Sequence, residues 1–152
     1  MNREVALIRS ELYVAKGEAE RKIVKRLAKQ FEDASLGNPE AALDFIVEIL
    51  STPDLYAKPR IDLFVTWLWL DKCKFEHTAK HKLVSALKSY YHCYENARLC
   101  DALGEMIGKC FERSEALELF DHLYPLSTEV GRKGIQCGVY EMEFRSRHQD
   151  EE

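Results

Sequence analysis

The chain has 152 residues, of which 46% are apolar and 32% are charged, so one folded domain is expected and disorder is not. A formal net charge of −4 suits a basic protein partner better than nucleic acid, which is held mainly through phosphate contacts. The 7 glycines and 4 prolines are too few for a β-sandwich and favour helices joined by short turns.

The compartment is indicated by what the sequence lacks. The opening residues, MNREVALIRSELY, carry charges where a secretory signal has its apolar run. The longest uncharged apolar run, Leu63–Leu70, is shorter than the roughly 20 residues needed to span a bilayer. The 5 cysteines are an odd number without a close CxxC pair, which favours free thiols. A cytoplasmic protein without membrane spans is therefore expected.

Residues 1–36 are expected to form one or two N-terminal helices. Apolar residues recur at steps of three and four from Val5 to Phe31, the pattern of an amphipathic helix, and Gly17 is a possible break. The opposite side of the second half is basic and is interpreted as a solvated face that could contact an anionic partner. Its cations are Arg21, Lys22, Lys25, Arg26 and Lys29.

A first helical hairpin is expected after residue 37. Gly37 suits the end of one helix, Asn38 can cap the next, and Pro39 fits its first turn. These signals predict a helix over Pro39–Leu50 and, after a break at residues 51–54, a second over Lys58–Asp71.

Two further hairpins are expected in the second half of the chain. The predicted helices of the second hairpin are Phe75–Tyr91 and Glu95–Phe111. In the third, Ser114 is the expected cap of a helix that Pro125 stops near Leu123, and Ser127 or Thr128 caps a helix to about Phe144. Residues 145–152 are a polar tail that we expect to be frayed.

The second and third hairpins resemble each other. Leu83–Met106 and Leu119–Met142 lie at an offset of 36 residues, and in each an apolar helix, a polar turn and a second helix end in Glu-Met. A unit of this size cannot bury its apolar face alone, so its recurrence indicates hairpins stacked side by side.

The segment Ala102–Met106 (ALGEM), preceded by Arg98, is similar to the second helix of HEAT-type repeats, and the similarity covers residues 38–144. The resemblance implies a single all-α domain, 1–152, that contains a short right-handed α-solenoid of about three hairpins. The departures are a shorter spacing than the usual period of about 40 to 47 residues, and an ALG segment in one unit only.

Cys73, His77 and His81 are the sharpest chemical constellation, because a spacing of four places them on one stripe of a helix. Three such ligands and an open position would suit catalytic zinc. The surrounding lysines disfavour a dication, so packing or surface roles are preferred and no metal or cofactor is predicted.

Two other patterns have structural interpretations. Tyr90–Tyr94 (YYHCY) contains a thiol beside an imidazole, but adjacent residues align poorly for proton transfer, and the tyrosines are interpreted as packing or contact residues. Gly131, Gly134 and Gly138 fall inside a predicted helix and cost roughly 1 kcal/mol each relative to alanine, which indicates a close helix approach.

A partner-binding stripe is expected on the second helices of the three hairpins, which line one surface in HEAT-like arrays. It mixes acids, arginine and aromatic side chains, as protein interfaces do. The predicted residues are Asp62, Thr66, Trp69, Arg98, Asp101, Glu105, Gln136, Tyr140 and Glu143.

These observations favour a non-catalytic protein-binding module, and the usual nucleotide-binding, zincin and hydrolase motifs are absent. In size, charge and architecture the chain looks like a bacterial immunity protein, which implies a basic toxin domain, such as a nuclease, as partner. The alternatives are a HEAT-like nucleic-acid-binding protein and a metal-dependent enzyme that uses Cys73, His77 and His81.

Overall fold

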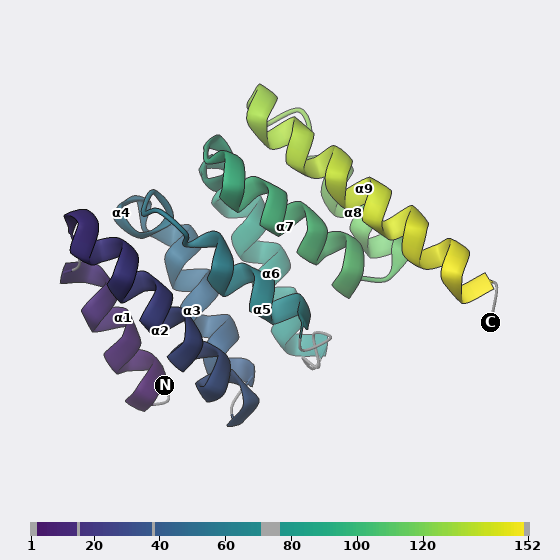
Figure 1. Cartoon of the computed structure of the whole chain (residues 1–152). Coiled ribbons are helices and arrows are strands. Elements are labelled where there is room, and N and C mark those ends of the chain that lie inside the picture. Colours follow the sequence, from purple (N-terminus) through teal and green to yellow (C-terminus); the bar gives the residue numbers. More distant parts are fainter. Residues whose placement is uncertain (1–2, 15, 38, 71–76, 151–152) are drawn as a thin grey trace.

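The structure is a computed structural model that describes residues 3–14, 16–37, 39–70 and 77–150, and the described residues contain helices and no strand (Figure 1). The all-α class expected from the composition is confirmed for this part of the chain. The helices are α1 (Arg3–Val14), α2 (Gly17–Gly37), α3 (Pro39–Ser51), α4 (Pro53–Tyr56), α5 (Asp62–Leu70), α6 (His77–Ser89), the 3-10 turn η1 (Tyr91–Glu95), α7 (Ala97–Cys110), α8 (Arg113–Leu123) and α9 (Glu129–Asp150).

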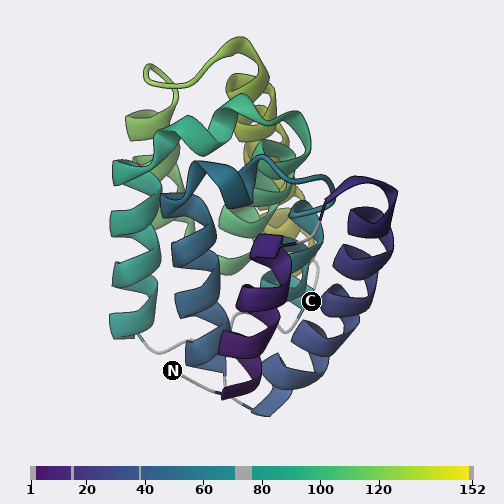
Figure 2. The same cartoon turned by 90° about the vertical axis from the view of Figure 1, so that its left-hand side faces the viewer.

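The longer helices lie in two layers (Figures 1 and 2). In one layer α2, α5, α7 and α9 follow one another, each in contact with the next. In the other layer α1, α3, α6 and α8 follow one another in the same way. Successive long helices therefore alternate between the layers, and each layer presents a row of helices to its own side of the molecule.

Several helix boundaries follow local signals in the sequence, of which the break at Gly17 and the cap at Thr128 were predicted. Gly17 begins α2 with a φ of 71°, a left-handed conformation that glycine adopts without strain, so the N-terminal segment is split there. The side chain of Asn96 begins α7 by accepting a hydrogen bond from the Leu99 amide at 3.0 Å. Thr128 caps α9 in the same way, its Oγ1 accepting from the Gly131 amide at 3.2 Å.

The start of α5 differs from the prediction. The helix predicted from Lys58 begins at Asp62, because Arg60 lies at a φ of 65° and interrupts regular helix geometry. A short helix, α4, and a turn occupy the intervening residues.

The last two helices also differ in their ends. The cap of α8 is Glu112 and not Ser114, and the Glu112 amide donates to Glu115 Oε1 at 3.4 Å. The helix predicted to end near Phe144 extends as α9 to Asp150.

One hydrophobic core runs between the layers. In its N-terminal half, three fully buried rings from α2, α3 and α5 meet: Phe31, Phe45 and Phe64. The Phe31 centroid lies 5.1 Å from that of Phe45 and 5.1 Å from that of Phe64, and Phe45 and Phe64 are 5.4 Å apart. Tilted and edge-on rings at these distances favour aromatic packing. The cluster joins the helices that precede and follow the turn at Arg60.

The helices α7 and α9 approach each other through glycine. A Cβ atom built on Gly104 would meet the backbone of Gly134, and one built on Gly138 would lie 2.7 Å from the carbonyl carbon of Gly104. The same is true of Gly108, whose added Cβ would meet the backbone of Gly138. The close approach expected from the glycine spacing in the last helix is confirmed.

Tyr94 supplies the first test of the core. Its ring is fully buried, and among the described residues its hydroxyl has no hydrogen-bond partner. A buried hydroxyl without a partner loses its water and gains nothing in return, so Tyr94→Phe should raise the free energy of unfolding by about 1 kcal/mol. Urea denaturation of both proteins measures the change. Lower stability of the variant would show that the hydroxyl has a partner, and Tyr140→Phe, at an exposed residue, is the control.

Candidate functional site

The predicted metal stripe is not assembled in the described part of the chain. Cys73 lies outside the described residues, and His77 begins α6 with a side chain that is also outside them. His81 is exposed on α6. No group of three potential metal ligands comes together among the residues that the structure describes.

The thiols are not suited to nucleophilic catalysis. Burial raises the pKa of Cys93 to about 12 and is the main cause that raises the pKa of Cys100 to about 11. Cys93 is fully buried, whereas its neighbour His92 is exposed and lies 4.0 Å from Glu95, so the suggested thiol–imidazole pair is not formed.

The expectation of free cysteines is confirmed for Cys93, Cys100 and Cys137. It is wrong for Cys110, which is disulfide-bonded, its partner lying outside the described residues. An odd number of cysteines does not prevent one bond, because pairing depends on how closely the fold brings two side chains together.

The residues of the predicted stripe lie on three adjacent helices of one layer, with α7 between α5 and α9 (Figure 1). Asp62, Thr66 and Trp69 belong to α5, Arg98, Asp101 and Glu105 to α7, and Gln136, Tyr140 and Glu143 to α9. The helices therefore lie in the order that the stripe requires, and the individual side chains differ in where they point.

Acidic side chains gather where α7 meets α9. The electrostatic neighbours of Cys137 are Asp101 and Glu105 from α7 and Glu141 from its own helix. The pKa of Glu105 is raised first by burial, then by Glu141, and further by Asp101, and Lys109 opposes this rise. Lys109 Nζ lies 3.8 Å from Glu141 Oε2, so one lysine balances only part of the charge. We call the carboxylates of Asp101, Glu105 and Glu141 the acidic cluster.

The side of α9 that faces α7 is defined by its contacts. Besides the glycines, Arg145 donates from Nη1 to the Lys109 carbonyl and from Nη2 to the Phe111 carbonyl, the latter at 2.6 Å. Further around the helix from this side, Cys137, Tyr140 and Phe144 recur at steps of three and four and form an exposed stripe, of which Cys137 adjoins the acidic cluster. Tyr140 is 69% exposed.

Gln136, Tyr140 and Glu143 share the outer face of α9. They follow one another at steps of four and three residues, and this face is turned away from the one that Gly134 and Gly138 pack against α7. Glu143 Oε1 lies 2.8 Å from Nη1 of Arg113, at the start of α8. The three residues therefore stay on one stripe, and Cys137 lies on the helix surface between this stripe and the acidic cluster.

The remaining residues of the predicted stripe lie outside the acidic cluster. On α5, Thr66 Oγ1 donates to the Asp62 carbonyl at 3.0 Å, and Asp62 Oδ1 is buried without a hydrogen bond among the described residues. The Trp69 side chain is outside the described residues. Arg98 is exposed in the first turn of α7.

Glu105 of the acidic cluster should make the stability of the protein depend on pH. Because its pKa is higher in the folded state, its ionised form costs stability at neutral pH, and this cost is relieved as pH falls through the folded pKa. We expect Glu105→Gln to be more stable than wild type at neutral pH, with the difference shrinking in acid. Thermal denaturation at a series of pH values measures it, and a difference that is constant with pH would contradict the assignment.

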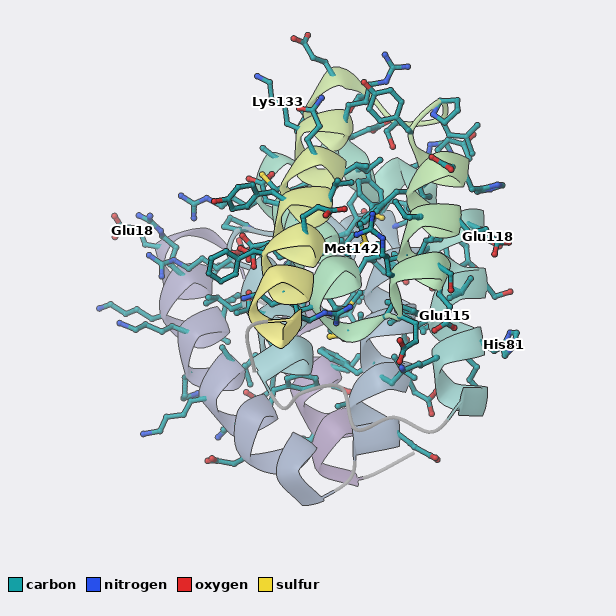
Figure 3. All side chains as sticks on the ribbon, turned by 90° about the vertical axis from the view of Figure 1, so that its right-hand side faces the viewer. Glu18, His81, Glu115, Glu118, Lys133 and Met142 are labelled. Carbon is teal, nitrogen blue, oxygen red and sulfur yellow. The ribbon has the colours of Figure 1, made fainter. Side chains whose placement is uncertain are left out.

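A hollow of about 300 Å³ lies in the other layer, between α6 and α8. Lys80, His81 and Lys88 line one wall, and Glu115 and Glu118 line the other. Figure 3 shows His81, Glu115 and Glu118 on one side of the molecule, with Glu18 of α2 on the opposite side. The positive charge of one wall balances the negative charge of the other, so this hollow carries less net charge than the acidic cluster.

Cys137 and Glu141 were missed by the sequence prediction. A signal for them was present, because each follows a glycine by three residues, at 134 and 138. Once those glycines are known to face α7, the residues three positions later must flank the contact.

None of the described helices has both the length and the apolar character that crossing a membrane requires. Comparison of the chain with protein-family models, with curated proteins and with solved structures finds no match.

Proposed function

We propose that this chain is a non-catalytic protein-binding module whose partner docks on the face formed by α5, α7 and α9. The observation that carries the proposal is the acidic cluster of Asp101, Glu105 and Glu141 where α7 meets α9, together with the exposed ring of Tyr140 on the outer face of α9. Carboxylates attract and orient a basic surface, and tyrosine offers a large amphipathic contact area. This combination fits a basic protein surface better than a small molecule.

In this proposal the two layers are a short right-handed α-solenoid of about three HEAT-like hairpins, preceded by α1 and α2. Support comes from the alternation of successive long helices between the layers. The second helix of each hairpin, α5, α7 or α9, then contributes to the same surface. A row of parallel helices offers an extended face, as a protein partner requires.

The most specific form of the proposal is a cytosolic immunity protein that neutralises a toxin, with a basic nuclease domain as partner. A negatively charged inhibitor competes for the basic surface with which a nuclease holds phosphates. The disulfide at Cys110 is uncommon for a cytosolic protein, so the compartment stays a prediction.

Affinity capture at low and high salt tests the proposal with wild type and the variant Asp101→Lys/Glu105→Lys. We expect wild type to retain a basic protein with nanomolar or tighter, salt-sensitive affinity. Reversing two charges at the centre of the contact should weaken binding about a hundredfold, since like charges placed opposite each other cost several kcal/mol.

The matched control is Glu40→Lys/Asp121→Lys, which changes the net charge equally at exposed residues of the other layer. Its affinity should stay within about threefold of wild type, because charges far from a contact act only through the screened overall field. Micromolar binding that is indifferent to salt, or an equal loss in the control, would contradict the proposal.

The alternatives have less support. A nucleic-acid cradle on the same face would oppose phosphates with Asp62, Asp101 and Glu105, against Arg98. A mobility shift at low salt that depends on Arg98 would favour that reading. A metal-dependent enzyme would need Cys73 and His77 to join His81, and metal analysis of the purified protein tests it directly.

A further inference from the structure

The most concentrated positive charge of the described residues lies along α2. Arg21, Lys22, Lys25 and Lys29 are exposed on this helix. Two hollows run beside them, of about 330 Å³ and about 630 Å³, and both are lined by Lys22 and Lys25. The two hollows adjoin at these lysines, and we call them together the basic groove. Its lining also includes Arg26, Gln30, Glu18 and Asp33. Arg60 lines one part of it and Leu63 the other.

The cations of the basic groove outnumber its two carboxylates, Glu18 and Asp33. One lining cation is paired, since Arg26 Nη2 lies 2.7 Å from Glu11 Oε2, and nearby Lys58 Nζ lies 3.5 Å from Glu20 Oε1. No ion pair of the described residues includes Arg21, Lys22, Lys25, Lys29 or Arg60. Gathering like charges without partners is unfavourable in the free protein, and an anionic ligand relieves it.

Arg60 is a second, independent indication. Its φ of 65° is a left-handed conformation, and it is the one described residue other than glycine with a positive φ. Glycine adopts this conformation with less strain, so an arginine at this position is retained against local preference. Strained residues cluster where a side chain has a binding role, and this one lines the groove with Arg21, Lys22 and Lys25.

The lining of the groove indicates the chemistry of its ligand. The accessible apolar side chain of the lining is that of the half-buried Leu63, since Ala28 is only 2% exposed. No aromatic side chain lines either hollow, so nothing there stacks on bases as single-stranded nucleic acid requires. The chain's net charge of −4 also repels a long polyanion. Carboxylates combined with apolar side chains match this lining.

The spacing matches a helical ligand. Arg21 and Lys29 are eight residues apart on α2, which at 1.5 Å per residue places them about 12 Å apart along the axis. Two turns of an approaching helix cover the same length, with carboxylates at steps of three and four.

We infer that the basic groove of Arg21, Lys22, Lys25, Lys29 and Arg60 binds an acidic, amphipathic segment of a protein. Its carboxylates pair with the cations, and its apolar residues contact Leu63. The basic groove has the opposite charge to the acidic cluster and lies on another helix, so this inference does not rest on the proposed function.

Fluorescence anisotropy of full-length protein tests the inference with a dye-labelled helical peptide that alternates glutamate pairs with leucines. Saturable binding is expected for this probe. A peptide with serine in place of leucine should bind more weakly, and one with lysine in place of glutamate should not bind. Lys22→Glu/Lys25→Glu should weaken binding about tenfold or more, because two attractive pairs become repulsive.

The matched control is Lys82→Glu/Lys133→Glu, which changes the net charge equally at exposed lysines outside the groove. It should keep the affinity within about twofold, since the long-range effect of remote surface charges is screened by salt. Equal loss in both variants, absence of binding by wild type, or tighter binding of a single-stranded oligonucleotide of the same charge would overturn the inference.

Arg60→Gly separates binding from folding. The melting temperature should stay equal or rise, because glycine relieves the left-handed strain, while peptide affinity falls about threefold with the loss of one cationic contact. A variant with unchanged affinity would overturn the assignment of Arg60 to the site.

Discussion

Gly138→Ala is expected to lower the free energy of unfolding by roughly 3 kcal/mol, at the upper end of the cost of overpacking. The added methyl group would lie 2.6 Å from Cζ of Phe120 and 2.7 Å from the carbonyl carbon of Gly104. The backbone of α7 cannot turn aside as a flexible side chain would, so the two helices must separate. Alanine gains about 1 kcal/mol of helix propensity over glycine, which is smaller than this steric cost.

Urea denaturation followed by circular dichroism measures the loss in Gly138→Ala. Gln136→Ala, at an exposed position of the same helix, is the matched control and should stay within about 0.5 kcal/mol of wild type. A Gly138→Ala protein as stable as wild type would mean that α7 and α9 do not meet at this position.

Phe45→Ala should cost about 3–5 kcal/mol, the range for removing a large aromatic side chain from a core. The ring is fully buried, and its partners Phe31 and Phe64 come from the two flanking helices of the other layer. Both ring contacts are lost together, and the cavity is bounded by rigid helices that collapse only in part. Calorimetric unfolding measures the effect.

Tyr140→Ala is the control for this cavity, because that ring is 69% exposed and its removal leaves no hole. Its stability should change by less than about 1 kcal/mol. Equal losses in the two variants would show that the aromatic cluster is not the centre of the N-terminal core.

The candidate site was predictable in part. Asp101 and Glu105 are four residues apart on one helix, so the sequence alone places them on one face. Their approach to Glu141 of α9 depends on the α7–α9 crossing, which glycine spacing suggests but does not orient. The sequence also places Gln136, Tyr140 and Glu143 on one face of α9, but it does not show that this face is turned away from α7.

The basic groove shows the same division. The cations of α2 were recognised in the sequence because they recur on one side of an amphipathic helix. Arg60 was not, because no local pattern indicates that an arginine in a turn will adopt a left-handed conformation and line a groove with Lys22 and Lys25.

By itself the sequence determined that the chain is helical, since the apolar period, the cap at Thr128 and the break at Gly17 are local features that act within one or two turns. Only the tertiary structure decided which helix faces meet. That choice depends on contacts between residues far apart in the chain, such as Gly104 with Gly138 and Arg145 with the end of α7. The acidic cluster depends on those contacts, because its residues come from two helices.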